Sequence, residues 1–187
     1  TVEAHLRLAR AALAADRFTL AQSAAQTVGR DANRPSAQAE ITDPVWVESR
    51  HIEAQAALFN AETRRAVEVL IEAIWAVEQS ESLDVPTLVS FKLQLAQAYV
   101  EAGQATKGID AAMDAVQLRT NLGPEHPLAL STQVQLGEIY LHFHRIDEAI
   151  ATFEDALRMQ VWALGAMHPD TLRTQELLAN AQESRSI

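Results

Sequence analysis

The stretch LGPEHPLAL at residues 122–130 returns as LGAMHPDTL at residues 164–172, 42 residues later. A loop that serves one active site needs no second copy, whereas a loop that recurs at a fixed interval indicates that the surrounding structure recurs too. His126 and His168 recur with the loop, so we expect them to cap or pack the start of a helix rather than to catalyse. The sequence therefore predicts a repeat protein.

Prolines mark the same boundary along most of the chain. Their positions are Pro44, Pro86, Pro127 and Pro169, which are separated by 42, 41 and 42 residues. Proline suits the first position of a helix because its fixed φ matches the helix and its missing N–H would be unpaired there. Asp43 supplies an N-capping carboxylate directly before the first of them. Each of these prolines is expected to open a helix.

Helical spacing after each proline predicts two helices joined by a short break. The expected pairs are 45–59 with 64–79, 87–100 with 105–119, and 128–143 with 146–163. Residues 2–15 and 18–28 show the same pattern without a proline, and 170–182 forms one final helix. We therefore divide the single domain, 1–187, into repeats at about 1–30, 44–80, 86–121 and 127–164, a capping helix at 169–184 and a linker at 29–43.

Small residues recur at matching places inside these helices. They are Ala9, Ala54, Ala96 and Gly137 in the first helix of each pair and, twelve residues later, Ala21, Ala66, Gly108 and Ala149 in the second. Two helices approach closely only where no bulky side chain intervenes. These positions are therefore predicted to form the seam along which the two helices of each pair meet.

The composition agrees with an all-α chain and argues against several classes of function. The chain is 48% hydrophobic and holds only six glycines and six prolines, which favours helix over strand. A formal charge of −10 repels phosphate, so neither nucleic acid nor an anionic membrane is an expected partner. No cysteine is present for disulfides or thiolate catalysis. Neither a signal peptide nor an apolar run of about 20 residues is evident, and a cytoplasmic location is favoured.

Several of these segments resemble the tetratricopeptide repeat. They are Leu95-Ala96 with Tyr99, Leu136-Gly137 with Tyr140, and Ile146-Asp-Glu-Ala149 with Phe153 and Ala156. The interval near 42 residues and the Leu-Gly-x-x-His-Pro loop are similar to the longer repeats of kinesin light chain, and related arrays are attached to bacterial regulatory ATPases and kinases. The resemblance implies an all-α fold, a right-handed superhelical solenoid of helix hairpins with a C-terminal capping helix. The second repeat departs from the family pattern at Glu53 and Ala57, where the family has large apolar or aromatic residues.

In this family the first helix of each hairpin lines a concave face, and the resemblance implies that this face binds partners. The residues expected there are Leu6, Arg10, His51, Gln55, Phe59, Leu93, Gln97, Val100, Val134, Glu138, Leu141 and His142. Rows of apolar side chains alternate with amides and charges, which suits an extended peptide or an amphipathic helix. The alternative is that the apolar rows only pack against adjacent helices. The lysines and asparagines with which some family members clamp a terminal carboxylate are missing.

No catalytic, metal or cofactor site is expected. The glycine-rich phosphate loops and the H-E-x-x-H and G-x-S-x-G motifs are absent. His142 and His144 lie near Glu138 and Asp147 in the sequence, and such side chains can bind zinc. However, residues two apart on a helix point to nearly opposite sides, so the two histidines are not expected to converge.

The sequence thus predicts a non-catalytic protein–protein interaction module that binds a peptide or partner protein in a concave groove. The alternative is a regulatory or sensor segment of a larger signalling ATPase, kinase or transcription regulator. A start at Thr1 instead of methionine favours a fragment or a processed product. Homo-oligomerisation also stays open, because the first repeat has no preceding neighbour to cover its apolar edge.

Overall fold

A computed structural model describes residues 1–32, 43–80 and 84–185. Within these ranges the chain forms nine α-helices and one short 3-10 helix, and no strand. The helices are α1 Val2–Ala14, α2 Phe18–Asp31, α3 Pro44–Phe59, α4 Thr63–Glu78, α5 Val85–Glu101, α6 Ala105–Leu118, η1 Arg119–Asn121, α7 Pro127–His142, α8 Ile146–Leu164 and α9 Pro169–Arg185. None of the described helices has both the length and the apolar character needed to cross a membrane.

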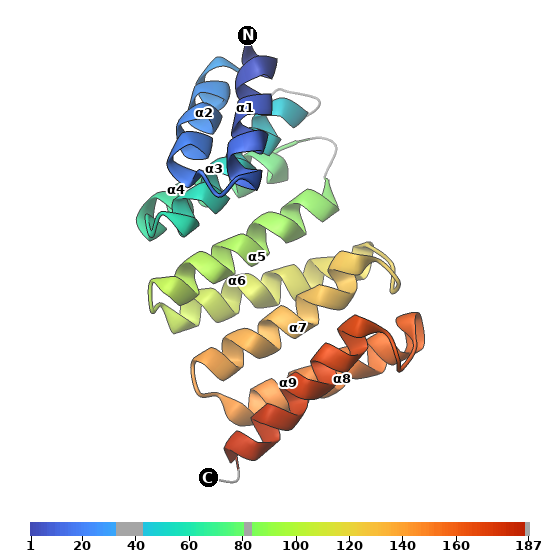
Figure 1. The fold of residues 1–187 in the computed structure, drawn as a ribbon. Helices are drawn as coiled ribbons and strands as arrows, with labels where there is room; N and C mark the ends of the chain where they lie inside the picture. The colour runs from blue at the N-terminus through green and yellow to red at the C-terminus, as the bar shows by residue number, and fades with distance from the viewer. Residues whose placement is uncertain (33–42, 81–83, 186–187) are drawn as a thin grey trace.

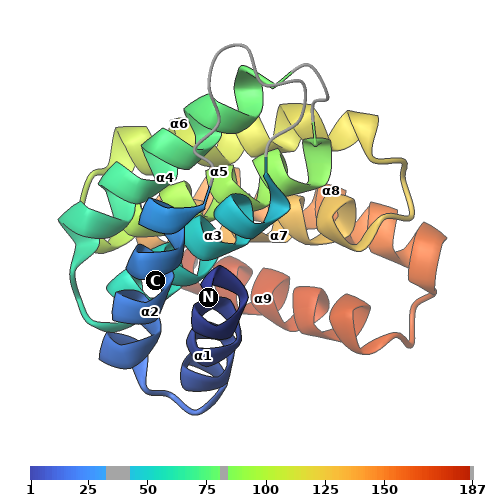
Figure 2. The ribbon, with the colours of Figure 1, turned by 90° about the horizontal axis from the view of Figure 1, so that it is seen from above.

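The helices form four hairpins, α1–α2, α3–α4, α5–α6 and α7–α8, and α9 closes the array (Figure 1). Each second helix contacts its own first helix and the next first helix along the chain. The first helices also contact one another, α1 with α3, α3 with α5 and α5 with α7. Figure 2, which looks along the stack, shows that the hairpins at the two ends are rotated relative to each other. This all-α solenoid of helix hairpins is the fold that the sequence predicted.

The two copies of the Leu-Gly-x-x-His-Pro loop have the same conformation. Gly123 and Gly165 have φ values of +87° and +89°, in the left-handed region that favours glycine. The Nδ1 atoms of His126 and His168 accept a hydrogen bond from the backbone N–H two residues later, at 3.2 and 3.3 Å. Glycine makes the turn, histidine caps the helix and proline opens it, which confirms the expected helix-start role of both histidines.

The predicted linker at 29–43 is partly helical. Helix α2 continues to Asp31, and residues 33–42 of the linker lie outside the described residues. Gly29 lies inside this helix and does not end it. The guanidinium of Arg50, from α3, lies so close that a Cβ atom at position 29 would overlap it. The glycine makes room for a charged side chain from the next hairpin.

The predicted seam of small residues is buried along its whole length. Its members Ala9, Ala54, Ala96 and Gly137 of the first helices, and Ala21, Ala66, Gly108 and Ala149 of the second, are all buried. At Gly137 the ring of Phe153 from α8 lies so close that a Cβ atom there would be 2.5 Å from its Cε1 atom. The helices of each hairpin therefore meet where the sequence placed their smallest residues.

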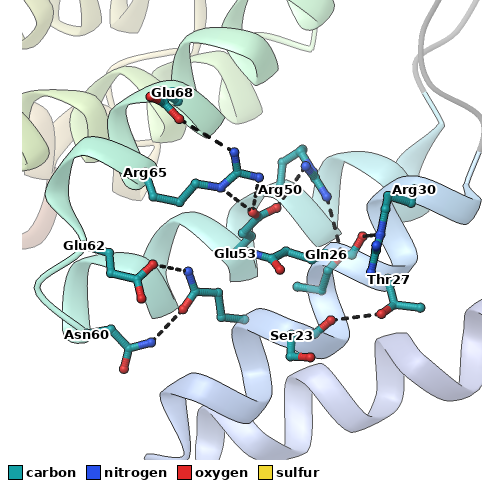
Figure 3. A network of polar contacts seen from close by, with 12 residues as sticks. Ser23, Gln26, Thr27, Arg30, Arg50, Glu53, Asn60, Glu62, Arg65 and Glu68 are labelled. Atoms are coloured by element: carbon teal, nitrogen blue, oxygen red, sulfur yellow. Dashed lines mark hydrogen bonds and ion pairs between the residues drawn. The ribbon is translucent and has the colours of Figure 1, made fainter.

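The second repeat holds a buried ion network around Glu53, one of the two residues that depart from the repeat pattern that the sequence resembles (Figure 3). Glu53 on α3 is fully buried, and its Oε2 atom lies 2.9 Å from Nη1 of Arg50 one turn earlier. Its Oε1 atom accepts a hydrogen bond of 2.6 Å from Nη2 of Arg65 on α4. Glu53 is equivalent by the repeat interval to Leu95 and Leu136. A carboxylate can occupy this core position because two arginines neutralise it.

Each hairpin turn holds one residue in the left-handed region, at φ values of +54° for Asp16, +58° for Ala61, +67° for Gly103 and +57° for His144. A residue with a Cβ atom is strained by about 1–2 kcal/mol in this region, and glycine is not. Part of this advantage of glycine is lost because glycine makes the unfolded chain more flexible. We expect Ala61→Gly to raise the free energy of unfolding by about 0.5–1 kcal/mol. Urea unfolding followed by circular dichroism measures the change.

The matched variant is Gly103→Ala, which we expect to lower the free energy of unfolding by about 1 kcal/mol. No atom lies within 4 Å of a Cβ built at this position, so steric overlap does not contribute. The expected loss of stability comes from backbone strain alone. If both variants shift the unfolding midpoint in the same direction, turn geometry does not explain the pattern.

Candidate functional site

A hollow of about 410 Å³ opens on the side of the array formed by the first helices and the capping helix. We call it the central hollow, and its lining residues are Leu93, Gln97 and Val100 of α5, Gln135, Glu138, Ile139 and His142 of α7, and Arg173 of α9. Five of the residues predicted for the concave face meet here. The helix order accounts for this, because α5 contacts α7, and α9, which packs on α8, is joined to α7 by the ion pair of Arg173 and Glu138.

The central hollow has an apolar base and a polar rim. Leu93 and Val100 are buried, whereas Gln97 and His142 are exposed. Arg173 donates a hydrogen bond of 2.7 Å from Nη2 to Oε1 of Glu138, and this ion pair joins α9 to α7. Because that carboxylate is paired, the hollow presents amide and imidazole groups around an apolar surface without a large local charge.

A second hollow of about 390 Å³ lies where α7, α8 and α9 meet. We call it the distal hollow, and its lining includes Leu130, Val134, Gln135 and Glu138 of α7, Gln160 and Leu164 of α8, and His168, Asp170, Arg173 and Thr174 at the start of α9. It shares Gln135, Glu138 and Arg173 with the central hollow. The Glu138–Arg173 ion pair therefore lies between two adjoining spaces.

A third hollow, of about 700 Å³, lies between the starts of α3 and α5 and includes His51, another predicted residue. The Nδ1 atom of His51 lies 2.9 Å from Nε2 of Gln94, and its ring centroid lies 6.0 Å from that of Phe91. Burial lowers the pKa of His51, which favours the neutral imidazole. A neutral ring next to an aromatic ring contributes a largely apolar wall.

The remaining predicted residues lie elsewhere. Leu6 is buried in the core of the first hairpin, and Arg10 forms an ion pair with Glu48 across α1 and α3. The hydrogen bond and charge of Glu48 raise the pKa of Arg10. Phe59 is the last residue of α3, and its ring stacks on that of Phe18 from α2 with the ring centroids 4.3 Å apart. Gln55 and Leu141 are half-buried and line none of the three hollows.

Sequence reasoning missed several lining residues, among them Gln135, Gln160 and Arg173. Gln135 lies one turn before Glu138, so it could have been found by extending the predicted row along α7. Arg173 follows Pro169, whose 42-residue interval marks α9 as a fifth first helix. Gln160 lies on a second helix, where the family pattern gives no reason to look.

The two candidate metal ligands near the end of α7 lie on different elements. His142 ends α7, and His144 lies in the following turn with a φ value of +57°. In the described part of the chain, no group of three or more histidines, aspartates or glutamates is placed to hold a metal ion.

Comparisons with known proteins agree with this architecture. Residues 88–160 match the family model described as tetratricopeptide repeat, and no curated protein matches the chain. A crystal structure of a Podosopora anserina putative kinesin light chain with nearly identical TPR-like repeats is similar, with a TM-score of 0.81 and 24% identity over 99% of this chain and 87% of that one.

More distant structures share the fold. BtubC (BKLC) from P. vanneervenii has a TM-score of 0.69 and 16% identity, covering 99% of this chain and 67% of that one. The apo form of RapI has a TM-score of 0.73 and 13% identity, covering 99% and 68%. In total 239 solved chains match, so the fold is too widely shared to indicate one function.

Proposed function

We propose that this chain is a non-catalytic interaction module that binds a peptide or a partner protein on its inner face, the side that the first helices and α9 form. Residues 88–160 match the tetratricopeptide repeat model, and the chain has the fold of a solved repeat structure. The observation that supports the proposal is the central hollow, where Leu93, Val100 and Ile139 lie among polar side chains of α5, α7 and α9 that include the Glu138–Arg173 ion pair. Stacked hairpins provide extended concave surfaces, and such surfaces suit extended ligands.

The dimensions favour a short extended segment. The central and distal hollows adjoin along α7 from Leu130 to His142. Twelve residues of helix span about 18 Å, which is the length of about five residues of extended chain. The amide of Gln135 and the side-chain carbonyl of Gln97, whose Nε2 donates to Glu101 at 3.2 Å, can pair with peptide groups of such a segment. Leu93 and Val134 offer apolar contact.

The hollows suit binding better than catalysis. The hydroxyl of Ser131 donates to the carbonyl of Leu128 at 3.3 Å, and that of Thr174 donates to the carbonyl of Asp170 at 3.0 Å. Both hydroxyls of the distal hollow are thus engaged with backbone rather than with a general base, which a nucleophile would require.

A capture experiment tests the proposal. The chain is immobilised, partners from source cells are identified by mass spectrometry, and the affinity of the responsible segment is then measured by fluorescence anisotropy. The test variant is Gln97→Arg with His142→Arg, because both side chains are exposed at the rim of the central hollow. We expect it to weaken binding by about tenfold or more, as loss of a central contact does.

The matched control is Gln79→Arg with Gln117→Arg, two exposed positions at or near the ends of second helices. It adds the same charge and should leave the affinity unchanged. Leu93 and Val134 are unsuitable targets because both are buried, so a charge there would test folding. Equal effects of the two double variants would place the partner away from the inner face.

A further inference from the structure

The second helices form the outer face of the array, and α4 presents an exposed row of side chains there. The row contains Arg64, Glu68, Ile71, Trp75 and Glu78, which follow one another at intervals of four, three, four and three residues. Side chains at these intervals lie on one side of a helix. All five are exposed, and Ile71 and Trp75 are each 49% exposed. We call this row the α4 stripe.

The centre of the α4 stripe is apolar and lies in the middle of the outer face. Ile71 and Trp75 are one turn apart, and Met113, the equivalent of Ile71 on the next second helix, is 42% exposed. The outer face of a solenoid is convex, so a second rigid surface touches it first in the middle, where α4 and α6 lie. Grouped apolar side chains of this kind mark contact sites, whereas single ones need no explanation.

The α4 stripe is complementary to a second copy of itself. Its two ends carry opposite charges, because the Arg64 side chain is 94% exposed at one end and the Glu78 side chain is 42% exposed at the other. Each lies seven residues from Ile71. In an antiparallel pair with the two Ile71 side chains face to face, Arg64 of each copy therefore faces Glu78 of the other. Trp75 then lies opposite Val67, since both are four residues from Ile71.

The charges disfavour other ways of pairing two stripes. A parallel pair would place Arg64 against Arg64 and Glu78 against Glu78. An antiparallel pair shifted by one turn, with Ile71 facing Trp75, would place Glu68 opposite Glu78. Like charges that face each other across an interface disfavour the complex. One antiparallel register therefore combines apolar contact at the centre with opposite charges at both ends.

The contacts that the two charged ends make within one chain leave room for a second partner. Nε of Arg64 donates to Oε1 of Glu68 at 3.1 Å, and Oε1 of Glu78 lies 3.2 Å from Nζ of Lys92. A guanidinium has five N–H donors and a carboxylate has two oxygens, so each group can form a further bond. The ion pair between copies therefore requires neither existing contact to break.

We propose that two copies of this chain associate through the α4 stripe as an antiparallel dimer with two-fold symmetry. The same axis places α6 of one copy opposite α6 of the other, so Met113 extends the apolar centre. An interface centred on one helix is small, and the dimer should form at about micromolar concentrations or above. The inner face stays open, so the dimer neither requires nor prevents the proposed partner binding.

Sedimentation equilibrium of the chain from about 1 μM to 1 mM measures the dimer, and charge reversal tests its geometry. Arg64→Glu and Glu78→Arg each place like charges at both ends of the pair, so each variant should dimerise about tenfold more weakly or less than that. An equimolar mixture of the two variants has opposite charges at both ends again. We expect the mixture to form heterodimers with an affinity close to that of the parent chain.

A pair of matched variants locates the contact. Ile71→Lys should weaken the dimer by about tenfold or more, whereas Leu8→Lys, at a 42% exposed position on α1, should leave it unchanged. Urea midpoints check that each variant is folded, and Lys92 keeps its contact with Asp114 at 3.3 Å when Glu78 is replaced.

Three results would overturn the inference. The first is a parent chain that stays monomeric over the whole concentration range. The second is a mixture of the two charge variants that associates no better than either variant alone. The third is a dimer that Leu8→Lys disrupts and Ile71→Lys does not, which would place the contact on the first hairpin.

Discussion

Glu53→Ala is expected to lower the free energy of unfolding by about 3–5 kcal/mol, the cost of removing one partner from a buried ion pair. Arg50, whose side chain is 7% exposed, would lose the Glu53 carboxylate that lies 2.9 Å from its Nη1 atom. Arg65 would lose its 2.6 Å bond as well, although its side chain is 41% exposed and can turn toward water. Most of the cost therefore falls on Arg50.

Urea unfolding followed by tryptophan fluorescence measures this change close to its origin. Trp46 is buried, and the guanidinium of Arg50 lies 5.7 Å from its ring centroid. The control is Glu68→Ala, which removes an exposed carboxylate that pairs with Arg64 at 3.1 Å and Arg65 at 3.8 Å. Exposed pairs contribute about 0–1 kcal/mol, so the control should stay within that range. A Glu53→Ala loss as small as the control's would mean that the network does not stabilise the fold.

Replacement of the buried pair by apolar residues tests whether a large loss of stability comes from the unpaired charge or from lost packing. Arg50→Met with Glu53→Leu restores the leucine found at the equivalent positions Leu95 and Leu136. Apolar substitution of a buried pair is often neutral or stabilising, so this double variant should recover most of the stability that Glu53→Ala loses. Failure to recover would show that the two side chains have a packing role that Met and Leu cannot fill.

The ion network shows where sequence reasoning stops. The sequence identified Glu53 as a departure from the family pattern but gave no partner for it. Its partners lie one turn away on α3 and across the hairpin on α4, and the equivalents of Arg50 and Arg65 in the third repeat are Lys92 and Lys107. A positive charge at these positions is thus common to both repeats. Only the placement of α3 against α4 shows that here the charges point to one carboxylate.

The repeat itself was predictable because it depends on local chemistry. Proline at helix starts, glycine in turns and small residues at contacts each have a physical reason that holds wherever the residue occurs. The binding surface was predictable in part, since the rows on α5 and α7 follow from helical periodicity. Phe59 and Gln160 depend on neighbours from other elements, a ring on α2 and the walls of a hollow, which periodicity does not specify.

The two buried glycines of the seam differ in whether they can be replaced by alanine, and comparison of the repeats does not show this difference. Gly108 is equivalent to Ala66 and Ala149, and Gly137 is equivalent to Ala54 and Ala96. Alignment alone therefore predicts that alanine is tolerated at both positions. The structure separates them: a Cβ atom at 108 would meet its nearest atom at 3.4 Å, whereas a Cβ atom at 137 would lie 2.5 Å from Cε1 of Phe153.

We expect Gly137→Ala to lower the free energy of unfolding by about 1–3 kcal/mol, the usual cost of overpacking a core. Phe153 is fully buried, so its ring has little room to move away. Gly108→Ala should raise the free energy of unfolding by about 0.5–1 kcal/mol, because alanine orders a helix more cheaply than glycine and meets only ordinary van der Waals contacts. Urea midpoints with unchanged slopes would measure both.

The residue opposite the seam explains why glycine occurs in the fourth repeat. The position of Phe153 is held by Leu70 in the second repeat and by Ala112 in the third, and those repeats have alanine where the fourth has Gly137. A larger side chain on the second helix thus goes with a smaller one on the first. If this is the cause, Phe153→Leu should cost less in the Gly137→Ala background than in the parent chain, because leucine makes room for the new methyl group. Strict additivity of the two changes would show that the ring and the glycine are not matched.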